Sequence, residues 1–180
     1  CPVAGFERAG IAEIDMPVCD KQEFTLDGLS VAAMHVPGHT QDHMAWYLPD
    51  HDVVFTGDSL FAGGCGRLFD GSAGQMWGSL VSLMRLPDTT DIYCGHEYTV
   101  ENLQFALSLE PDNARVGDRL EHAIARRKER RSTLPPTLGL EKATNPFLRA
   151  GDPALRRALR MSDASDEAVF ARIRKQKDRY

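Results

Sequence analysis

Three short segments of the sequence place a potential metal ligand directly after a glycine. They are Gly38-His39-Thr40, Thr56-Gly57-Asp58-Ser59 and Cys94-Gly95-His96-Glu97. Glycine lets the backbone turn sharply, and α/β proteins usually build their sites from loops at strand ends. A single histidine after a glycine is most often an ordinary turn residue. Three such positions, each after an apolar run, predict one shared metal site.

The donor types favour a pair of divalent metal ions. Imidazole suits zinc, iron and manganese, and an anionic carboxylate can bridge two cations. Asp58 is therefore the expected bridging and catalytic residue, with His39 and His96 as further metal ligands. Each catalytic zinc takes about three protein ligands, so these three residues are too few for two metals. The site predicted within this chain is incomplete.

The remaining histidines and Cys65 have structural explanations. An apolar strand, a turn and a charged helix are expected to contain His35, His51 and His122, respectively. His43 is expected to hydrogen-bond within the core and to orient the loop that carries His39. Cys65 has no neighbouring base that would activate its thiol, so we expect it to have a packing role.

The segments that must position these residues are predicted to be strands first and helices later. Apolar runs bounded by turn residues predict strands at residues 31–36, 44–48, 53–56 and 92–94. Helical spacing of apolar residues predicts helices at residues 75–86 and 100–109. The pattern is helical from Asn113 onward, with a charged helix at 114–131, a break at 134–136 and two closing helices, the last at 166–179. We therefore predict an α/β part, residues 1–112, and an all-helical part, residues 113–180.

Composition places the chain among ordinary globular proteins, with 42% hydrophobic and 26% charged residues. The four cysteines form no CxxC pair, which is typical of a reducing compartment and predicts a cytoplasmic protein. No apolar stretch approaches the roughly 20 residues that span a bilayer, so we expect no membrane partner. We expect a monomer.

Charge is distributed unevenly along the chain. Residues 1–118 carry five basic and eighteen acidic side chains, a net −13, and residues 119–180 carry sixteen basic and eight acidic ones, a net +8. The basic part could attract a small anion, a nucleic acid or the acidic part beside it. No aromatic residue is interleaved among the arginines of residues 126–131, which makes nucleic acid the least favoured of the three. We expect no nucleic-acid partner.

The residues around these positions resemble the glyoxalase II family of the metallo-β-lactamase superfamily. The resemblance covers nearly the whole chain, and its motifs are Pro37-Gly38-His39-Thr40, Phe55-Thr56-Gly57-Asp58-Ser59-Leu60-Phe61, Tyr93-Cys94-Gly95-His96-Glu97-Tyr98-Thr99, Gly64-Cys65-Gly66-Arg67-Leu68-Phe69-Asp70-Gly71, Thr144-Asn145-Pro146-Phe147-Leu148-Arg149 and residues 174–177.

The resemblance implies the C-terminal portion of an αββα sandwich followed by a helical substrate-binding domain, with two divalent metals at the sheet edge. The metals would be zinc, or else iron or manganese. By similarity, His39 binds the first metal, His96 binds the second, and Asp58 bridges them. The family carries a further Thr-His-X-His-X-Asp-His motif upstream, which supplies four more ligands and does not occur in these 180 residues. We therefore expect this chain to lack the N-terminal part of the family fold and to be inactive on its own.

The resemblance also implies hydrolysis of S-D-lactoylglutathione, a 2-hydroxyacyl glutathione thioester, to glutathione and D-lactate by a metal-bound hydroxide. Glutathione carries two carboxylates and one ammonium, and the family binds it where this sequence has Arg67, Tyr98, Arg174 and Lys177. Arg174 and Lys177 are three apart on the predicted last helix, so they share a face that can hold one glycine carboxylate. Phe69 stands where many members have tyrosine, which removes one hydrogen bond, worth about 1 kcal/mol, from the substrate site.

Two alternatives come from other functional classes. A persulfide dioxygenase has the same fold with a single iron, but the basic segment 174–177 and Asn145-Pro146-Phe147 resemble glyoxalase II. A non-catalytic glutathione-binding module is the second alternative, because the chain keeps the expected clamp and lacks four ligands.

Overall fold

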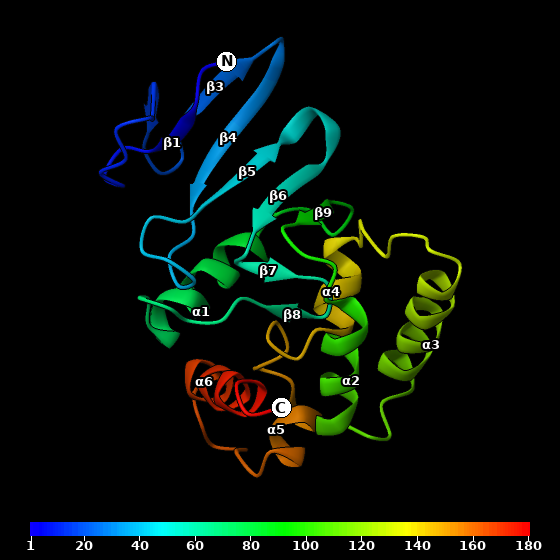
Figure 1. Cartoon of the computed structure of the whole chain (residues 1–180). Helices are drawn as coiled ribbons and strands as arrows, with labels where there is room; N and C mark the ends of the chain where they lie inside the picture. Colours follow the sequence, from blue (N-terminus) through cyan, green and yellow to red (C-terminus); the bar gives the residue numbers. More distant parts are fainter.

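A five-stranded sheet forms the centre of the upper part of the protein in Figure 1. The structure is a computed structural model that describes all residues, Cys1–Tyr180. In spatial order the strands are β3 (Glu23–Leu26), β4 (Leu29–His35), β5 (Met44–Leu48), β6 (Val53–Gly57) and β9 (Asp91–Cys94). Neighbours from β3 to β6 are antiparallel, whereas β6 and β9 are parallel. Strands β4, β6 and β9 therefore run in the same direction, and their carboxyl ends meet at one edge of the sheet.

The parallel pairing of β6 and β9 requires a long connection between them. This connection contains a two-stranded hairpin, β7 (Leu60–Phe61) and β8 (Gly64–Cys65), followed by helix α1 (Ala73–Leu83). Figure 1 shows the hairpin between the sheet and the C-terminal helices. The hairpin is thus placed to contact both the sheet edge and the helical part.

The four strands predicted from apolar runs are present as β4, β5, β6 and β9, with β4 at Leu29–His35 rather than at 31–36, whereas the remaining strands were not predicted. The N-terminal pair β1 (Ala4–Phe6) and β2 (Met16–Val18) is parallel, and β3 joins β4 through a tight turn at Asp27-Gly28. Both turn residues have positive φ, 49° and 86°, as a two-residue hairpin turn requires. The Asp-Gly pair was therefore the available signal for β3, whereas β1, β2, β7 and β8 are too short to show alternation.

The structure has six α-helices. None of them is long and apolar enough to span a membrane. After α1 they are α2 (Thr99–Leu109), α3 (Ala114–Lys128), α4 (Leu138–Thr144), α5 (Pro153–Ala158) and α6 (Asp166–Lys177). Side chains of Ser72, Asn113, Thr137, Asp152 and Ser165 cap five of them by accepting backbone N–H groups.

The predicted helix bounds need three corrections. Helix α1 ends at Leu83 rather than at residue 86, because the residues before Pro87 disfavour helical conformation. Helix α3 ends at Lys128 rather than at 131, where Arg130 adopts a left-handed conformation with φ of 57°. Helix α6 ends at Lys177 rather than at 179. The chain after Asn113 is not helical throughout, and α4 was missed because its seven residues are too few to show a clear period.

One hydrophobic core connects the sheet to the helices. Its buried members come from the sheet (Val54, Ile92), from α1 (Met76, Leu80) and from the helical part (Phe147, Phe170). This observation explains why α6 packs against α1 although the two are far apart in sequence. The order of an α/β part followed by helices is confirmed, and the division at residues 112 and 113 stays a prediction.

The opposite face of the sheet is only partly covered. The N-terminal segment packs Phe6 and Met16 against a small cluster around Ala33 and Met44. Further along, Phe55 and Tyr93 stack with ring centroids 5.4 Å apart and are 44% and 38% exposed. The face away from α1 therefore presents aromatic surface to solvent.

Candidate metal and substrate site

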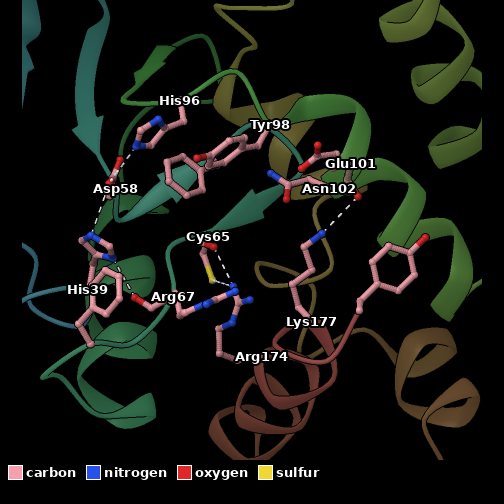
Figure 2. Close-up of a pocket in the computed structure, with 13 residues that line it drawn as sticks. His39, Asp58, Cys65, Arg67, His96, Tyr98, Glu101, Asn102, Arg174 and Lys177 are labelled. Atoms are coloured by element: carbon pink, nitrogen blue, oxygen red, sulfur yellow. Dashed lines mark hydrogen bonds and ion pairs between the residues drawn. The ribbon is translucent and has the colours of Figure 1, made fainter.

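The two predicted histidine ligands each lie close to Asp58 at the sheet edge where β4, β6 and β9 end. Oδ2 of Asp58 lies 3.4 Å from Nε2 of His39 and 3.3 Å from Nε2 of His96 (Figure 2). Asp58 directly follows β6, whereas His39 and His96 follow β4 and β9 by a few residues. The carboxylate is therefore between two imidazole nitrogens, which is the arrangement expected of a group that bridges two cations.

The donor set fits half of a two-metal centre. His39 and His96 lie on either side of Asp58, so these three residues would hold part of a two-metal centre (Figure 2). No group of three or more His, Cys, Asp or Glu side chains in this chain converges on one point closely enough to hold a metal ion. Catalytic zinc takes about three protein ligands, so two such ions would need more donors than these three residues supply.

The backbone of the 65–67 segment fixes the orientation of His39. Nδ1 of His39 lies 2.8 Å from the carbonyl oxygen of Arg67, so this nitrogen carries the proton and donates it. The other ring nitrogen, Nε2, lies on the side of Asp58. The ring of Phe69 packs edge-on against His39 with centroids 4.8 Å apart.

His43 supports Asp58 rather than the loop of His39. Its Nε2 accepts the backbone N–H of Asp58 at 3.0 Å, and burial lowers the pKa of the imidazole, which keeps the accepting neutral form. The neighbouring Gly57 has φ of 51°, and a Cβ at this position would overlap the ring of His43. The predicted hydrogen bond is confirmed, but its partner is the backbone N–H of Asp58.

His96 is held through its neighbours in the sequence. Its ring stacks on Tyr98 with centroids 4.8 Å apart and an interplanar angle of 13°. The adjacent carboxylate of Glu97 accepts hydrogen bonds from the Thr133 N–H at 2.9 Å, from the Ser132 hydroxyl at 3.2 Å and from the Thr133 hydroxyl. The loop that presents His96 is therefore fastened to the segment that follows α3.

The charge of Glu97 predicts a specific dependence of stability on pH. Burial disfavours the charged form, but hydrogen bonds from Thr133, Thr99 and Ser132 outweigh it and lower the pKa of Glu97 below its ordinary value of 4.5. A lowered folded-state pKa stabilises the fold above pH 4.5, and this contribution is lost as pH falls through the folded-state value. We expect Glu97→Gln to lower the free energy of unfolding at pH 7, and we expect the difference from wild type to shrink below pH 4.5.

Urea unfolding of both proteins between pH 7 and pH 3 measures this difference. Glu121→Gln, an exposed change on α3, is the matched control and should follow the wild-type profile. A Glu97→Gln difference that stays constant over the whole range would contradict the prediction.

A cavity of about 540 Å³ opens beside the three metal ligands. All eight site residues predicted from the sequence line it, namely His39, Asp58, Arg67, Phe69, His96, Tyr98, Arg174 and Lys177. Five further residues that were not predicted also line the cavity, namely Phe61, Cys65, Glu101, Asn102 and Tyr180. Glu101 and Asn102 lie within three or four residues of Tyr98 in the first turn of α2, which is the signal that could have identified them.

The basic residues of the cavity differ in how freely they can meet a ligand. The side chain of Arg67 is 65% exposed, with its Nε 3.7 Å from the carboxylate of Asp178. Nζ of Lys177 lies 3.3 Å from the carbonyl oxygen of Glu101, and it is 5.2 and 5.1 Å from the ring centroids of Phe105 and Tyr180. Burial, together with the nearby Arg174, lowers the pKa of Lys177. Arg174 is almost fully buried. Arg67 and Lys177 are thus the two cations most open to the cavity.

Cys65 has the properties of a packing residue. Its side chain is buried, and burial raises the pKa of the thiol to about 11 despite the nearby guanidinium of Arg174. A thiol of this kind is protonated at neutral pH and is a poor nucleophile. The cysteine therefore contributes to the wall of the cavity rather than to nucleophilic chemistry.

Two family models together match almost the whole chain. The model described as "Hydroxyacylglutathione hydrolase C-terminus" matches residues 97–180, and the one described as "Metallo-beta-lactamase superfamily" matches residues 9–96. Among curated proteins, hydroxyacylglutathione hydrolases of Brucella ovis and Brucella abortus are 50% identical over 174 residues. These matches cover 97% of this chain and 68% of each relative.

Solved structures share the fold. ETHE1 from Myxococcus xanthus superposes with a TM-score of 0.62 at 25% identity, covering 96% of this chain and 56% of that one. A metallo-beta-lactamase from Staphylococcus aureus gives a TM-score of 0.55 at 22% identity, covering 94% of this chain and 45% of that one. This chain therefore spans about half the length of these structures and about two thirds of the curated relatives.

Proposed function

The chain belongs to the hydroxyacylglutathione hydrolase family of the metallo-beta-lactamase superfamily, and from this premise we propose that it serves the hydrolysis of S-D-lactoylglutathione to glutathione and D-lactate. In this proposal the chain contributes the glutathione-binding wall of the cavity and half of the metal centre. The observation that carries the proposal is the position of Asp58 between His39 and His96, at the edge of a cavity that also contains exposed basic side chains.

Two divalent metal ions, zinc or else iron or manganese, fit the chemistry of these donors. Such ions supply a hydroxide nucleophile at neutral pH and polarise the thioester carbonyl. The protein's own part is to orient the ligands: the carbonyl of Arg67 fixes His39, and the imidazole of His43 fixes the backbone of Asp58. Two such ions would need further donors beside these three residues.

Substrate binding follows from the charges of glutathione. Its two carboxylates need cations, and Arg67 and Lys177 are open to the cavity. The phenol of Tyr98 can donate a hydrogen bond, while Phe69 offers an apolar surface that is 71% exposed. We propose that these side chains clamp the peptide portion while the thioester lies beside Asp58. Arg174, which the sequence assigns to the same clamp, lines the cavity from its base.

Turnover of S-D-lactoylglutathione, followed by loss of the thioester ultraviolet absorbance, tests the proposal. The 180-residue chain with added zinc, iron or manganese is expected to give background rates, because its three donors are too few to hold two metal ions. A chimera that adds the third of the Brucella ovis relative not covered by this chain is expected to hydrolyse the thioester. In the chimera, Asp58→Asn should lower kcat/KM at least about 100-fold, since even groups that only orient ligands contribute about 10–100-fold.

The outcomes separate this proposal from its alternatives. Robust turnover by the isolated chain would contradict the expectation that its three donors are too few to hold two metal ions. An Asp58→Asn chimera with undiminished activity would contradict the proposal that Asp58 is a metal ligand. Oxygen uptake by the chimera with glutathione persulfide, without thioester hydrolysis, would favour a persulfide dioxygenase. Binding of S-methylglutathione by a chimera that performs neither reaction would favour a non-catalytic binding module.

A further inference from the structure

The cavity beside the metal ligands is lined by charges of both signs. Its cationic side chains are Arg67, Arg174 and Lys177, and its carboxylates are Asp58 and Glu101. Asp58 lies between the two histidines and is therefore committed to the metal centre. Glu101 is thus the carboxylate of this lining that remains for a cationic group of a ligand.

Glu101 lies in the first turn of helix α2, where α2 meets the end of α6. Its carbonyl oxygen is 3.3 Å from Nζ of Lys177, the last residue of α6. Figure 2 shows Glu101 and Lys177 on the side of the cavity away from Asp58. The carboxylate of Glu101 makes no ion pair and accepts no hydrogen bond within the chain, and the residue is exposed. Its side chain is therefore free to meet a ligand in the cavity.

The other carboxylate in this region, that of Asp178, is already engaged. Its Oδ1 lies 3.2 Å from Nε and 3.0 Å from Nη2 of Arg174, and 3.7 Å from Nε of Arg67. A ligand cation at Asp178 would have to compete with two guanidinium groups. Glu101 has no guanidinium beside it, so it is the better counterion for a cation that enters the cavity.

The charges of glutathione leave one group without a partner among the residues discussed above. Its two carboxylates find cations in Arg67 and Lys177, which are open to the cavity. Its ammonium group, on the γ-glutamyl end, needs an anion or another hydrogen-bond acceptor once it leaves water. An unpaired carboxylate in the lining of the cavity supplies the complementary charge.

We propose that Glu101 is a specificity-determining residue that binds the ammonium group at the γ-glutamyl end of glutathione. This inference deepens the proposed function, because it takes a glutathione thioester as the substrate. The carboxylate attracts an amine and repels a further anion, so thioesters of acidic thiols without an amine should bind less well. An acidic residue in the first turn of a helix also stabilises that helix without any ligand. The test therefore has to depend on the ammonium group itself.

Calorimetric titration of the 180-residue chain with two ligands at pH 7 provides this test. One ligand is S-methylglutathione, and the other is its deaminated analogue, in which a glutaryl group replaces the γ-glutamyl group. We expect wild type to bind S-methylglutathione about 5-fold more tightly, which is the upper end for an ion pair that solvent reaches. Glu101→Gln keeps the shape of the side chain and should bring the two affinities together. Glu101→Lys should make the deaminated analogue the tighter ligand.

Lys177→Gln is the matched control within the same cavity. Both ligands retain their two carboxylates, so the loss of this cation should weaken both of them and preserve their ratio. A helix-stabilising role of Glu101 alone would likewise affect both ligands equally. Equal affinities of wild type for the two ligands would overturn the proposal, as would an unchanged ratio in Glu101→Gln or the absence of binding of either ligand.

The failure of this inference can be distinguished from the failure of the proposed function. Thioester hydrolysis by the chimera, with equal affinities for the two ligands, would reject the role of Glu101 and leave the thioesterase intact. The expected ratio, without thioester hydrolysis by the chimera, would reject the proposed function and leave the recognition of the ammonium group by Glu101 intact.

Discussion

Replacing Arg119 with methionine is expected to lower the free energy of unfolding by about 3–5 kcal/mol, which is the usual cost of removing one partner from a buried ion pair. The carboxylate of Glu141 is fully buried and accepts hydrogen bonds from the Gly63 N–H at 2.8 Å and from the Asn145 amide at 2.9 Å. Arg119, whose side chain is 8% exposed, is its cationic partner. Without Arg119, a buried charge would remain with neutral partners alone.

Urea unfolding followed by circular dichroism measures this loss. Arg131→Met is the matched control, because Arg131 pairs with Glu129 at the surface and both side chains are more than half exposed. We expect this control to change stability by no more than about 0.5 kcal/mol. A loss below about 1 kcal/mol for Arg119→Met would show that Glu141 does not depend on its cation. The double variant Arg119→Met with Glu141→Leu should recover part of the loss, since no buried charge then remains.

Gly66→Ala is expected to lower the free energy of unfolding by about 3 kcal/mol, at the upper end of the usual cost of overpacking. The added methyl group would overlap the backbone carbonyl of Asp58 and press on Nδ1 of His39. A backbone atom cannot rotate aside as a side chain can, so the 65–67 segment itself has to move. We therefore also expect the variant chimera to lose thioesterase activity together with stability.

Gly78→Ala is the control for this substitution. Gly78 lies in α1, and a Cβ at this position would have no atom within 4 Å. Alanine is favoured over glycine in a helix, so this change should raise stability by about 0.5–1 kcal/mol. Thermal and urea unfolding of the two variants under identical conditions compare the effects. Equal stability of Gly66→Ala and wild type would contradict the close packing of Gly66 on Asp58.

The local part of the fold was predictable from the sequence, whereas the tertiary part was not. Strand β5 and the caps of α3, α5 and α6 follow from apolar runs and from Asn113, Asp152 and Ser165. The short strands β1, β2, β7 and β8 contain two or three residues each, which is too few to show the alternation by which a strand is recognised. The order of strands in the sheet likewise depends on pairing rather than on local pattern.

The same division applies to the site. Glycine before His39, Asp58 and His96 identified residues that the structure brings together, because strand ends can be recognised locally. The inward direction of Arg174 could not be predicted, since helical spacing alone places it on the same face as Lys177. Only the packing of α6 beneath the β7–β8 hairpin shows that Arg174 donates to the carbonyl of Cys65 at 2.8 Å, whereas Lys177 has a longer contact of 3.3 Å with the carbonyl of Glu101.

The parallel pairing of β6 and β9 also determines when the site can form during folding. These strands become neighbours only after the intervening hairpin and α1 have been accommodated, so their contact has a large sequence separation and closes a long loop. Asp58 and His96 follow these two strands, and they meet only when the loop is closed. A chain that is collapsed but has not yet closed this loop has no bridging geometry to offer a metal ion. A metal ion that needed both Asp58 and His96 would therefore bind only after this loop had closed.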